Sequence, residues 1–161
     1  MKKLFLIRHA KAEEGGASKN DFFRNISPQG EGGALKKSVE LLQLIPSVDL
    51  IISSDASRAL QTAKIFAKTF NYSLETIITE HFLYNHYEPS ELLHLITGLS
   101  DNVNSVMIFG HNPNICYAAN ELCNQTIYSF PTSCVAYIEF ESNSWQDVTL
   151  MAGKLIYLLN D

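Results

Sequence analysis

Short apolar runs alternate along this chain with longer segments in which apolar residues recur every three or four positions. The runs at residues 4–7, 50–52 and 106–109 are uninterrupted by polar side chains, which is typical of strands buried on both faces of a parallel sheet. The spaced pattern between residues 57 and 70 is typical of a helix that buries one side. The chain therefore reads as an alternation of strands and helices.

The same reasoning assigns the remaining elements. We expect strands at residues 3–8, 49–53, 74–78, 105–109, 133–140 and 149–158. We expect helices at residues 27–45, 57–70, 89–99 and 114–124, with polar connections at 10–26 and 79–88. Gly15 and Gly16 are the expected turn residues of the first connection. In the first helix Ser27 is the expected N-cap and Pro28 the first helical residue, and Leu35, Val39 and Leu42 continue its apolar spacing.

Strands that alternate with helices predict a particular fold class. The expected class is α/β, with three layers: a mostly parallel central sheet and helices on both of its faces. The chain has 161 residues, a length typical of one domain. We therefore expect residues 1–161 to form a single domain.

Polar residues of a distinctive kind follow three of the predicted strands. Arg8 and His9 end the first strand, residues 53–55 end the second with Arg58 shortly after, and His111 follows the third. In a parallel sheet these carboxyl ends share one edge and surround one ligand. The pattern predicts a pocket that holds two arginines and two histidines.

These residue types suit phosphoryl transfer. Arginine presents a fork of donors that matches phosphate oxygens, and positioned cations stabilise the charge that spreads over a phosphoryl group in flight. A neutral histidine is a nucleophile, and nearby arginines lower its pKa so that it remains neutral near pH 7. Asn112 is the expected cap and Pro113 the first-turn proline of the next helix, whose N-terminus adds partial positive charge beside His111.

The composition and net charge of the chain argue against several classes of function. The net charge of −5 argues against general nucleic-acid binding, and no apolar stretch is long enough to cross a bilayer. The N-terminus lacks the long apolar region of a signal peptide, so we expect a cytoplasmic protein. Its three cysteines form no CxxC pair and indicate neither a disulfide framework nor a zinc finger.

The motifs together resemble the histidine phosphatase superfamily, which includes phosphoglycerate mutases and acid phosphatases. The segments are similar to those of the short SixA-like phosphohistidine phosphatases, and they occur in that family's order at residues 4–13, 21–30, 52–63 and 109–113. Residues 130–133 also resemble the family's turn before its next strand. The resemblance implies a phosphoglycerate mutase-like sheet.

The resemblance also implies roles for individual residues. His9 would be the nucleophile that becomes phosphorylated, Arg8 and Arg58 would bind phosphate oxygens, and His111 would donate to the phosphoryl group. Arg24 matches a family arginine near the pocket mouth, which implies substrate binding. The family's chemistry needs no metal and no cofactor, so we expect neither.

One departure from the family concerns the proton donor. Asn85 stands where many members have a carboxylate that serves as general acid, and an amide cannot serve in that way. Glu80 and Glu88 are near Asn85 in sequence and are alternative acids. We place Asn85 among the substrate-binding residues.

The expected function is a metal-independent phosphatase with a covalent phosphohistidine intermediate. Because the chain is short and lacks large insertions over the pocket, we expect a partner protein as substrate, carrying phosphohistidine on a histidine phosphotransfer domain or a phosphocarrier. Two alternatives remain: hydrolysis of small phosphomonoesters, and a catalytically weak module that binds phosphoproteins, for which Asn85 is the motivating residue.

Overall fold

The computed structural model describes residues 1–15 and 20–161. Within these residues six strands form one sheet, in the order β3-β2-β4-β1-β5-β6. The strands are β1 (Lys2–Arg8), β2 (Leu50–Ser53), β3 (Ile78–Thr79), β4 (Ser105–Gly110), β5 (Val135–Phe140) and β6 (Lys154–Leu159). Strand β1 is parallel to β4 and β2 is parallel to both β4 and β3, whereas β5 is antiparallel to both β1 and β6. The expected mostly parallel sheet is confirmed.

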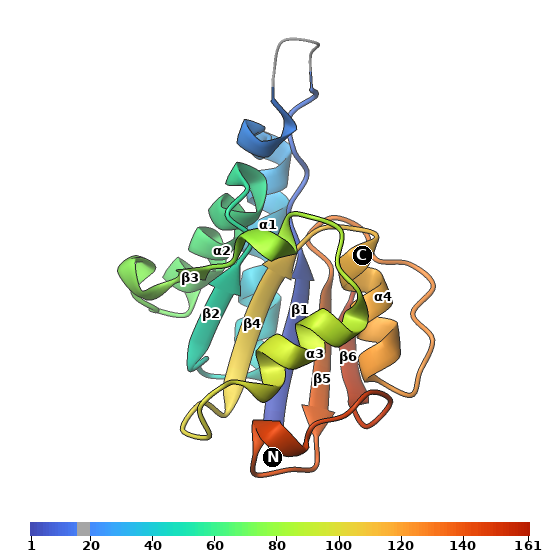
Figure 1. Ribbon diagram of the computed structural model, residues 1–161. Coiled ribbons are helices and arrows are strands. Elements are labelled where there is room, and N and C mark those ends of the chain that lie inside the picture. The colour runs from blue at the N-terminus through green and yellow to red at the C-terminus, as the bar shows by residue number, and fades with distance from the viewer. Residues whose placement is uncertain (16–19) are drawn as a thin grey trace.

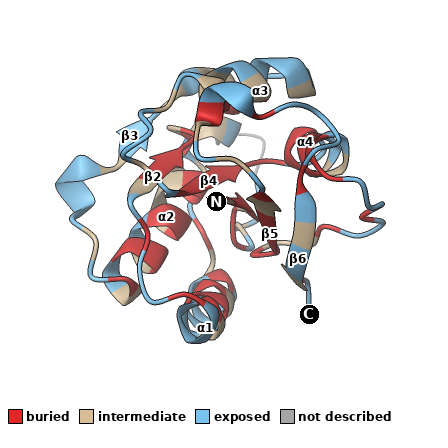
Figure 2. Cartoon of the chain, turned by 90° about the horizontal axis from the view of Figure 1, so that it is seen from below, coloured by how far each residue is buried: buried red, intermediate tan, exposed pale blue. Residues whose placement is uncertain are grey.

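Helices cover both faces of the sheet (Figures 1 and 2). They are α1 (Pro28–Leu44), α2 (Ser57–Thr69), α3 (Pro89–Thr97) and α4 (Asn114–Leu122). One buried cluster joins the sheet to α1 and α2 through residues such as Leu41 and Phe66. A second cluster joins the opposite face to α3 and α4 through residues such as Leu92 and Ile115. This is the predicted three-layer α/β fold.

The buried face of α1 differs from the prediction. Leu35, Val39 and Leu42 are exposed, whereas Ala34 and Leu41 are buried. The reason lies at Gly30, where a Cβ atom would stand 2.1 Å from the carbonyl oxygen of Lys11. This close backbone approach fixes the rotation of the helix, so the positions four and eleven residues after Gly30 face the core.

Two further expectations are wrong in their details. Residues 74–78 do not form a strand: Leu74–Thr76 is a 3-10 helix, and only Ile78–Thr79 pairs with β2. Leu74 and Ile78 are exposed, so the segment has no buried face to support a longer strand. The last strand starts at Lys154 instead of residue 149, because Met151 has a φ of 63° and Gly153 packs closely against the carbonyl of Leu122.

The described parts of the connection between β1 and α1, residues 10–15 and 20–26, lie at the carboxyl ends of the parallel strands (Figure 1). They contain a 3-10 helix, η1 (Asp21–Phe23), and a bridge between Ala12 and Ile26. Residues 16–19, including the expected turn residue Gly16, lie outside the described part of the chain. No described helix is long and apolar enough to cross a membrane.

Candidate active site

The sheet register brings the ends of β1, β2 and β4 together. Arg8 lies beside Gly110, and Ser53 lies beside Phe109 on the other side of β4. One residue further along, the amide of His9 donates to the carbonyl of Gly110 at 3.0 Å. The rings of His9 and His111 consequently lie 5.0 Å apart, centroid to centroid. The convergence expected from the sequence is therefore present.

His9 is held as a neutral imidazole with a defined tautomer. Its Nδ1 lies 2.8 Å from the carbonyl oxygen of Ala10, which can only accept, so Nδ1 carries the proton. Its Nε2 accepts a hydrogen bond from Nε of Arg58 at 3.3 Å. Burial, together with the charges of Arg58 and Arg8, lowers the pKa of His9 to about 4. Nε2 of His9 therefore carries no proton, and its lone pair faces Arg58.

His111 is buried beside His9. Its Nε2 lies 2.8 Å from Oγ of Ser54, and its Nδ1 has no partner among the described residues. Burial first, and then the proximity of His9 and Arg58, lowers the pKa of His111 to about 3. The ring is neutral near pH 7 and retains one nitrogen for a further hydrogen bond.

The two arginines expected to bind phosphate approach from different elements. Arg58 is buried in the first turn of α2. Arg8 ends β1 and donates from Nη1 to the carbonyl oxygen of Phe130 at 3.1 Å. Asn112 donates to that same carbonyl at 2.8 Å, so it does not cap α4, which begins at Asn114. The turn at residue 130 thereby ties Arg8 to the segment that carries His111.

A carboxylate that the sequence analysis gave no role lies among these cations. Oδ2 of Asp21 pairs with Nη2 of Arg58 at 3.0 Å, and Oδ1 pairs with Nη2 of Arg24 at 3.0 Å. The hydroxyl of Tyr84 donates to Oδ2 at 2.9 Å. Partial desolvation alone would raise the pKa of Asp21, but the Tyr84 hydrogen bond and the Arg58 charge hold it below its usual value. Asp21 is therefore ionised near neutral pH.

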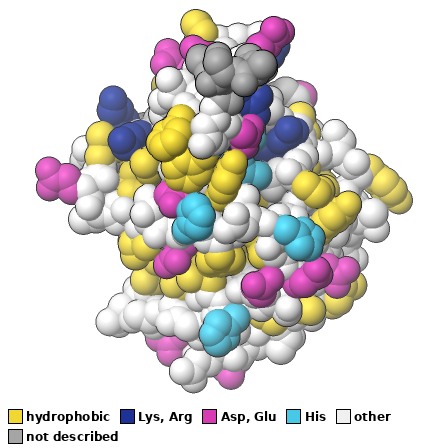
Figure 3. Space-filling model, turned by 45° about the horizontal axis from the view of Figure 1, so that its top comes forward, with side chains coloured by type: hydrophobic (Ala, Val, Ile, Leu, Met, Phe, Trp, Pro, Cys, Tyr) yellow, Lys and Arg dark blue, Asp and Glu magenta, His cyan; other side chains and the backbone are white. Residues whose placement is uncertain are grey.

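Aromatic side chains form the outer rim of the site, which we call the mouth: Phe22, Phe23, His81 and Tyr84. The Tyr84 ring stands edge-on to His111 at 5.6 Å and to Phe22 at 5.1 Å. Phe23 is 66% exposed. Figure 3 brings this end of the molecule forward and shows hydrophobic, basic, acidic and histidine side chains intermixed there.

Asn85 and its neighbouring carboxylates lie at the margin of the site. Asn85 is exposed, and its backbone carbonyl accepts from the side chain of Asn114 at 3.0 Å. Glu88 caps α3 and contacts His86 at 3.2 Å. Sequence reasoning placed Ser54 at the converging end of β2 but gave it no role. It missed Asp21 and Tyr84, whose only signal was that they stand close in sequence to Arg24 and Asn85.

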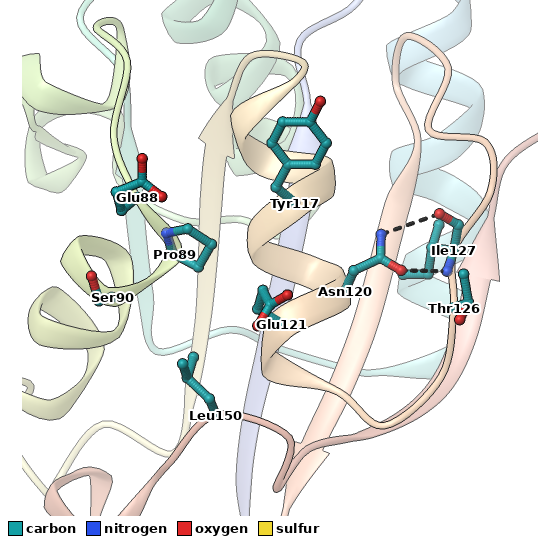
Figure 4. Close-up of a pocket in the computed structure, with 9 residues that line it drawn as sticks. All are labelled: Glu88, Pro89, Ser90, Tyr117, Asn120, Glu121, Thr126, Ile127 and Leu150. Atoms are coloured by element: carbon teal, nitrogen blue, oxygen red, sulfur yellow. Dashed lines mark hydrogen bonds between the residues drawn. The ribbon is translucent and has the colours of Figure 1, made fainter.

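A separate hollow of ≈590 Å³ lies between the start of α3 and α4 (Figure 4). Its lining includes the carboxylates of Glu88 and Glu121, and none of the described residues that line it is basic. Such a surface repels a phosphoryl dianion, so this hollow is not an alternative phosphate site. Among the described residues no three His, Cys, Asp or Glu side chains are grouped as metal ligands.

Comparison with solved structures agrees with the motifs. The SixA protein of Agrobacterium tumefaciens superposes with a TM-score of 0.81 and 27% identity, over 99% of this chain and 98% of that one. A SixA protein histidine phosphatase complexed with tungstate has a TM-score of 0.82 and 21% identity, over 98% and 96% of the two chains. A phosphoserine phosphatase of Entamoeba histolytica, complexed with 3-phosphoglyceric acid, has a TM-score of 0.69 and 15% identity, over 100% and 98%.

Sequence comparisons say less about the family of this chain than the solved structures do. No family profile matches the chain. An uncharacterised chloroplastic protein of Arabidopsis thaliana is 28% identical over 94% of this chain and 72% of its own length. The structural neighbours give the chain the histidine phosphatase superfamily fold, in the phosphoglycerate mutase-like arrangement of the SixA proteins.

Proposed function

We propose that residues 1–161 act as one phosphatase domain that transfers a phosphoryl group to His9 and then to water. The observation that carries the proposal is the state of His9: it is neutral, with Nδ1–H held by the Ala10 carbonyl and Nε2 facing Arg58. In the first step Nε2 attacks phosphorus and the bond from phosphorus to the leaving group breaks. In the second step water attacks phosphorus, the bond to Nε2 breaks, and phosphate leaves.

The surrounding residues have distinct roles in this proposal. Arg8 and Arg58 bind phosphoryl oxygens, and their charges stabilise the transition state. His111 supplies a hydrogen bond to the same oxygens. Arg24 lies further out and contacts substrate at the mouth. The tungstate held by a SixA neighbour supports an oxyanion site in a protein of this fold.

The favoured substrate is phosphohistidine on a partner protein. An ester leaves as a strongly basic alkoxide that needs a proton. A phosphohistidine whose other ring nitrogen carries a proton leaves as neutral imidazole, which is much less basic. Asp21 is the carboxylate that contacts Arg58, and its lowered pKa keeps it ionised, so it is a poor proton donor. With Asn85 in the position of the usual acid, the site suits phosphohistidine better than phosphomonoesters.

The partner is a protein with a protruding phosphohistidine, such as a histidine phosphotransfer domain or a phosphocarrier. The exposed aromatic mouth supports this choice, because aromatic side chains are enriched where proteins bind one another. We retain the cytoplasmic location as a prediction; the chloroplastic relative in Arabidopsis makes the compartment an open experimental question.

The deciding experiment compares substrates and traps the intermediate. Wild-type protein is incubated with a phosphohistidine-containing phosphotransfer domain and, in parallel, with a panel of phosphomonoesters. We expect faster turnover of phosphohistidine and an acid-labile phosphoryl adduct on His9. His9→Ala should lose both, whereas His94→Ala, which removes an exposed histidine on α3, should retain both. An active His9→Ala protein would exclude the mechanism, and preference for esters would exclude the substrate assignment.

A further inference from the structure

Arg58 is held at both ends of its guanidinium group. Nη1 donates to the backbone carbonyl of Asp21 at 2.8 Å, and Nη2 donates to Oδ2 of the same residue at 3.0 Å. Nε donates to Nε2 of His9 at 3.3 Å. Asp21 therefore occupies the terminal edge of the guanidinium, between Nη1 and Nη2, while the side edge faces His9.

This division leaves the side edge turned toward His9, where the only hydrogen bond to a described residue is the one from Nε to Nε2 of His9, so an entering phosphoryl group would meet this edge. A guanidinium has five N–H donors in a rigid plane, and these contacts use three of them. The second proton of Nη2 lies on the same side as Nε–H, so those two N–H groups form a pair directed toward His9. Two parallel donors of this kind match two oxygens of a phosphoryl group. Asp21 does not need to leave when an anion binds.

Asp21 also connects Arg58 to the mouth. Its other carboxylate oxygen pairs with Arg24 at 3.0 Å, and Tyr84 donates to the oxygen that holds Arg58. The Asp21 side chain is 53% exposed, but that of Arg58 is only 8% exposed. An exposed ion pair ordinarily contributes little, whereas losing the partner of a buried guanidinium leaves that group free to turn away from His9.

We propose that Asp21 is a positioning residue: it holds the Arg58 guanidinium with its Nε side edge against His9 and remains in place when the anion binds. This proposal rests on the proposed function in one respect only: both place an anion at the same site. Tungstate binding tests it without any need for turnover, so its failure is distinct from a failure of the phosphatase assignment.

The test is a cycle of variants with tungstate as the probe and calorimetry as the measurement. Asp21→Ala should weaken tungstate binding about tenfold in the wild-type background. A loss of this size is the most that removal of one charge-assisted hydrogen bond ordinarily causes. In an Arg58→Lys background the same change should cost less than about twofold, because lysine has no planar fork to orient. Asp147→Asn is the matched control, since Asp147 is an exposed acid in another 3-10 helix.

Kinetics separates positioning from general structural support. If the protein turns over phosphohistidine, Asp21→Ala should lower kcat more than it raises KM, because a misdirected guanidinium loses contacts that strengthen in the transition state. Tyr84→Phe, which removes one hydrogen bond to Asp21, should show the same pattern with a smaller effect. Thermal melting should confirm that each variant is folded.

Three outcomes would overturn the proposal. Tighter tungstate binding by Asp21→Ala would mean that the carboxylate competes with the anion. An equal loss in the wild-type and Arg58→Lys backgrounds would mean that Asp21 supports the fold of its segment and does not act through Arg58. Unchanged binding would mean that the ion pair has no consequence for the site.

Discussion

The floor of the site and its mouth are built in different ways. The floor consists of His9, His111, Arg58 and Ser54, all buried, together with the half-buried Arg8 at the end of β1. Backbone pairing between β1, β4 and β2 sets where most of these residues lie. The mouth consists of exposed or half-buried aromatic residues from η1 and the connection after β3, held by ring contacts. Under the proposed function, the strand ends carry the chemistry, and the connecting segments carry the choice of substrate.

Asp21 belongs to the mouth by its position and to the floor by its contacts. Its segment is exposed, yet its carboxylate fixes the orientation of buried Arg58. A floor assembled from strand ends therefore still depends on one side chain from a connecting segment. Changes in the floor should lower turnover of every substrate alike, whereas changes in the mouth should alter preference among substrates.

The largest effect is expected from the floor arginines. Arg8→Ala and Arg58→Ala should each lower kcat/KM by about 10²-fold for phosphohistidine and for esters alike, as removal of one preorganised oxyanion donor does. Both variants should also weaken inhibition by vanadate. Steady-state kinetics on both substrate classes measures this, with Lys64→Ala as the control because Lys64 is an exposed cation on the same helix as Arg58. Wild-type turnover in either arginine variant would contradict the assigned role.

The sequence was informative about the floor for a physical reason. Arg8, His9 and His111 directly follow uninterrupted apolar runs, and parallel pairing leaves little choice about where such residues meet. Arg58 lies in the first turn of α2, the helix that follows the second such run. No comparable rule predicts the contacts of the mouth from sequence. Asp21 and Tyr84 are 63 residues apart, and their contact depends on how two connections fold. The same limit explains α1, where backbone contact at Gly30, invisible in the apolar pattern, decides which face is buried.

A second expected effect concerns stability against pH. Burial lowers the pKa values of His9 and His111 to about 4 and about 3, below the ordinary value for histidine of about 6.5. The unfolded chain therefore takes up protons at these residues first as the pH falls. Stability should be full above about pH 6.5 and should decrease toward pH 4, by on the order of 1.4 kcal/mol per pH unit for each histidine.

Urea unfolding at pH 7 and pH 5 measures this dependence. His111→Asn should remove one of the two titrating groups and make the decrease shallower, whereas His94→Asn, in the exposed part of α3, should leave the wild-type slope unchanged. Wild-type stability that is constant over this interval would show that the floor histidines are not held neutral by burial. That result would also weaken the argument for His9 as a neutral nucleophile.

The smallest expected effect belongs to the mouth and concerns Asn85. This exposed residue follows Tyr84, whose ring packs against His111, and the prediction requires that a longer side chain at position 85 reaches the anion site. Asn85→Glu introduces a carboxyl group that can protonate an alkoxide, which an amide cannot do. We expect roughly a threefold to tenfold rise in phosphomonoester kcat/KM, a small part of the 10²–10⁴ that a well-placed acid supplies.

The discriminating measurement is the ratio of ester to phosphohistidine turnover. Phosphohistidine should respond little to Asn85→Glu, because its imidazole leaving group is less basic and needs less help from an acid. Asn85→Gln has the length of the glutamate without its proton, so it should leave both rates near wild type. If Asn85→Glu raised both rates equally, or if Asn85→Gln produced the same rise, side-chain length and not proton donation would be responsible. Preference for phosphohistidine would then have to come from the aromatic mouth, whose residues, under the proposed function, contact the partner and not the reacting phosphorus.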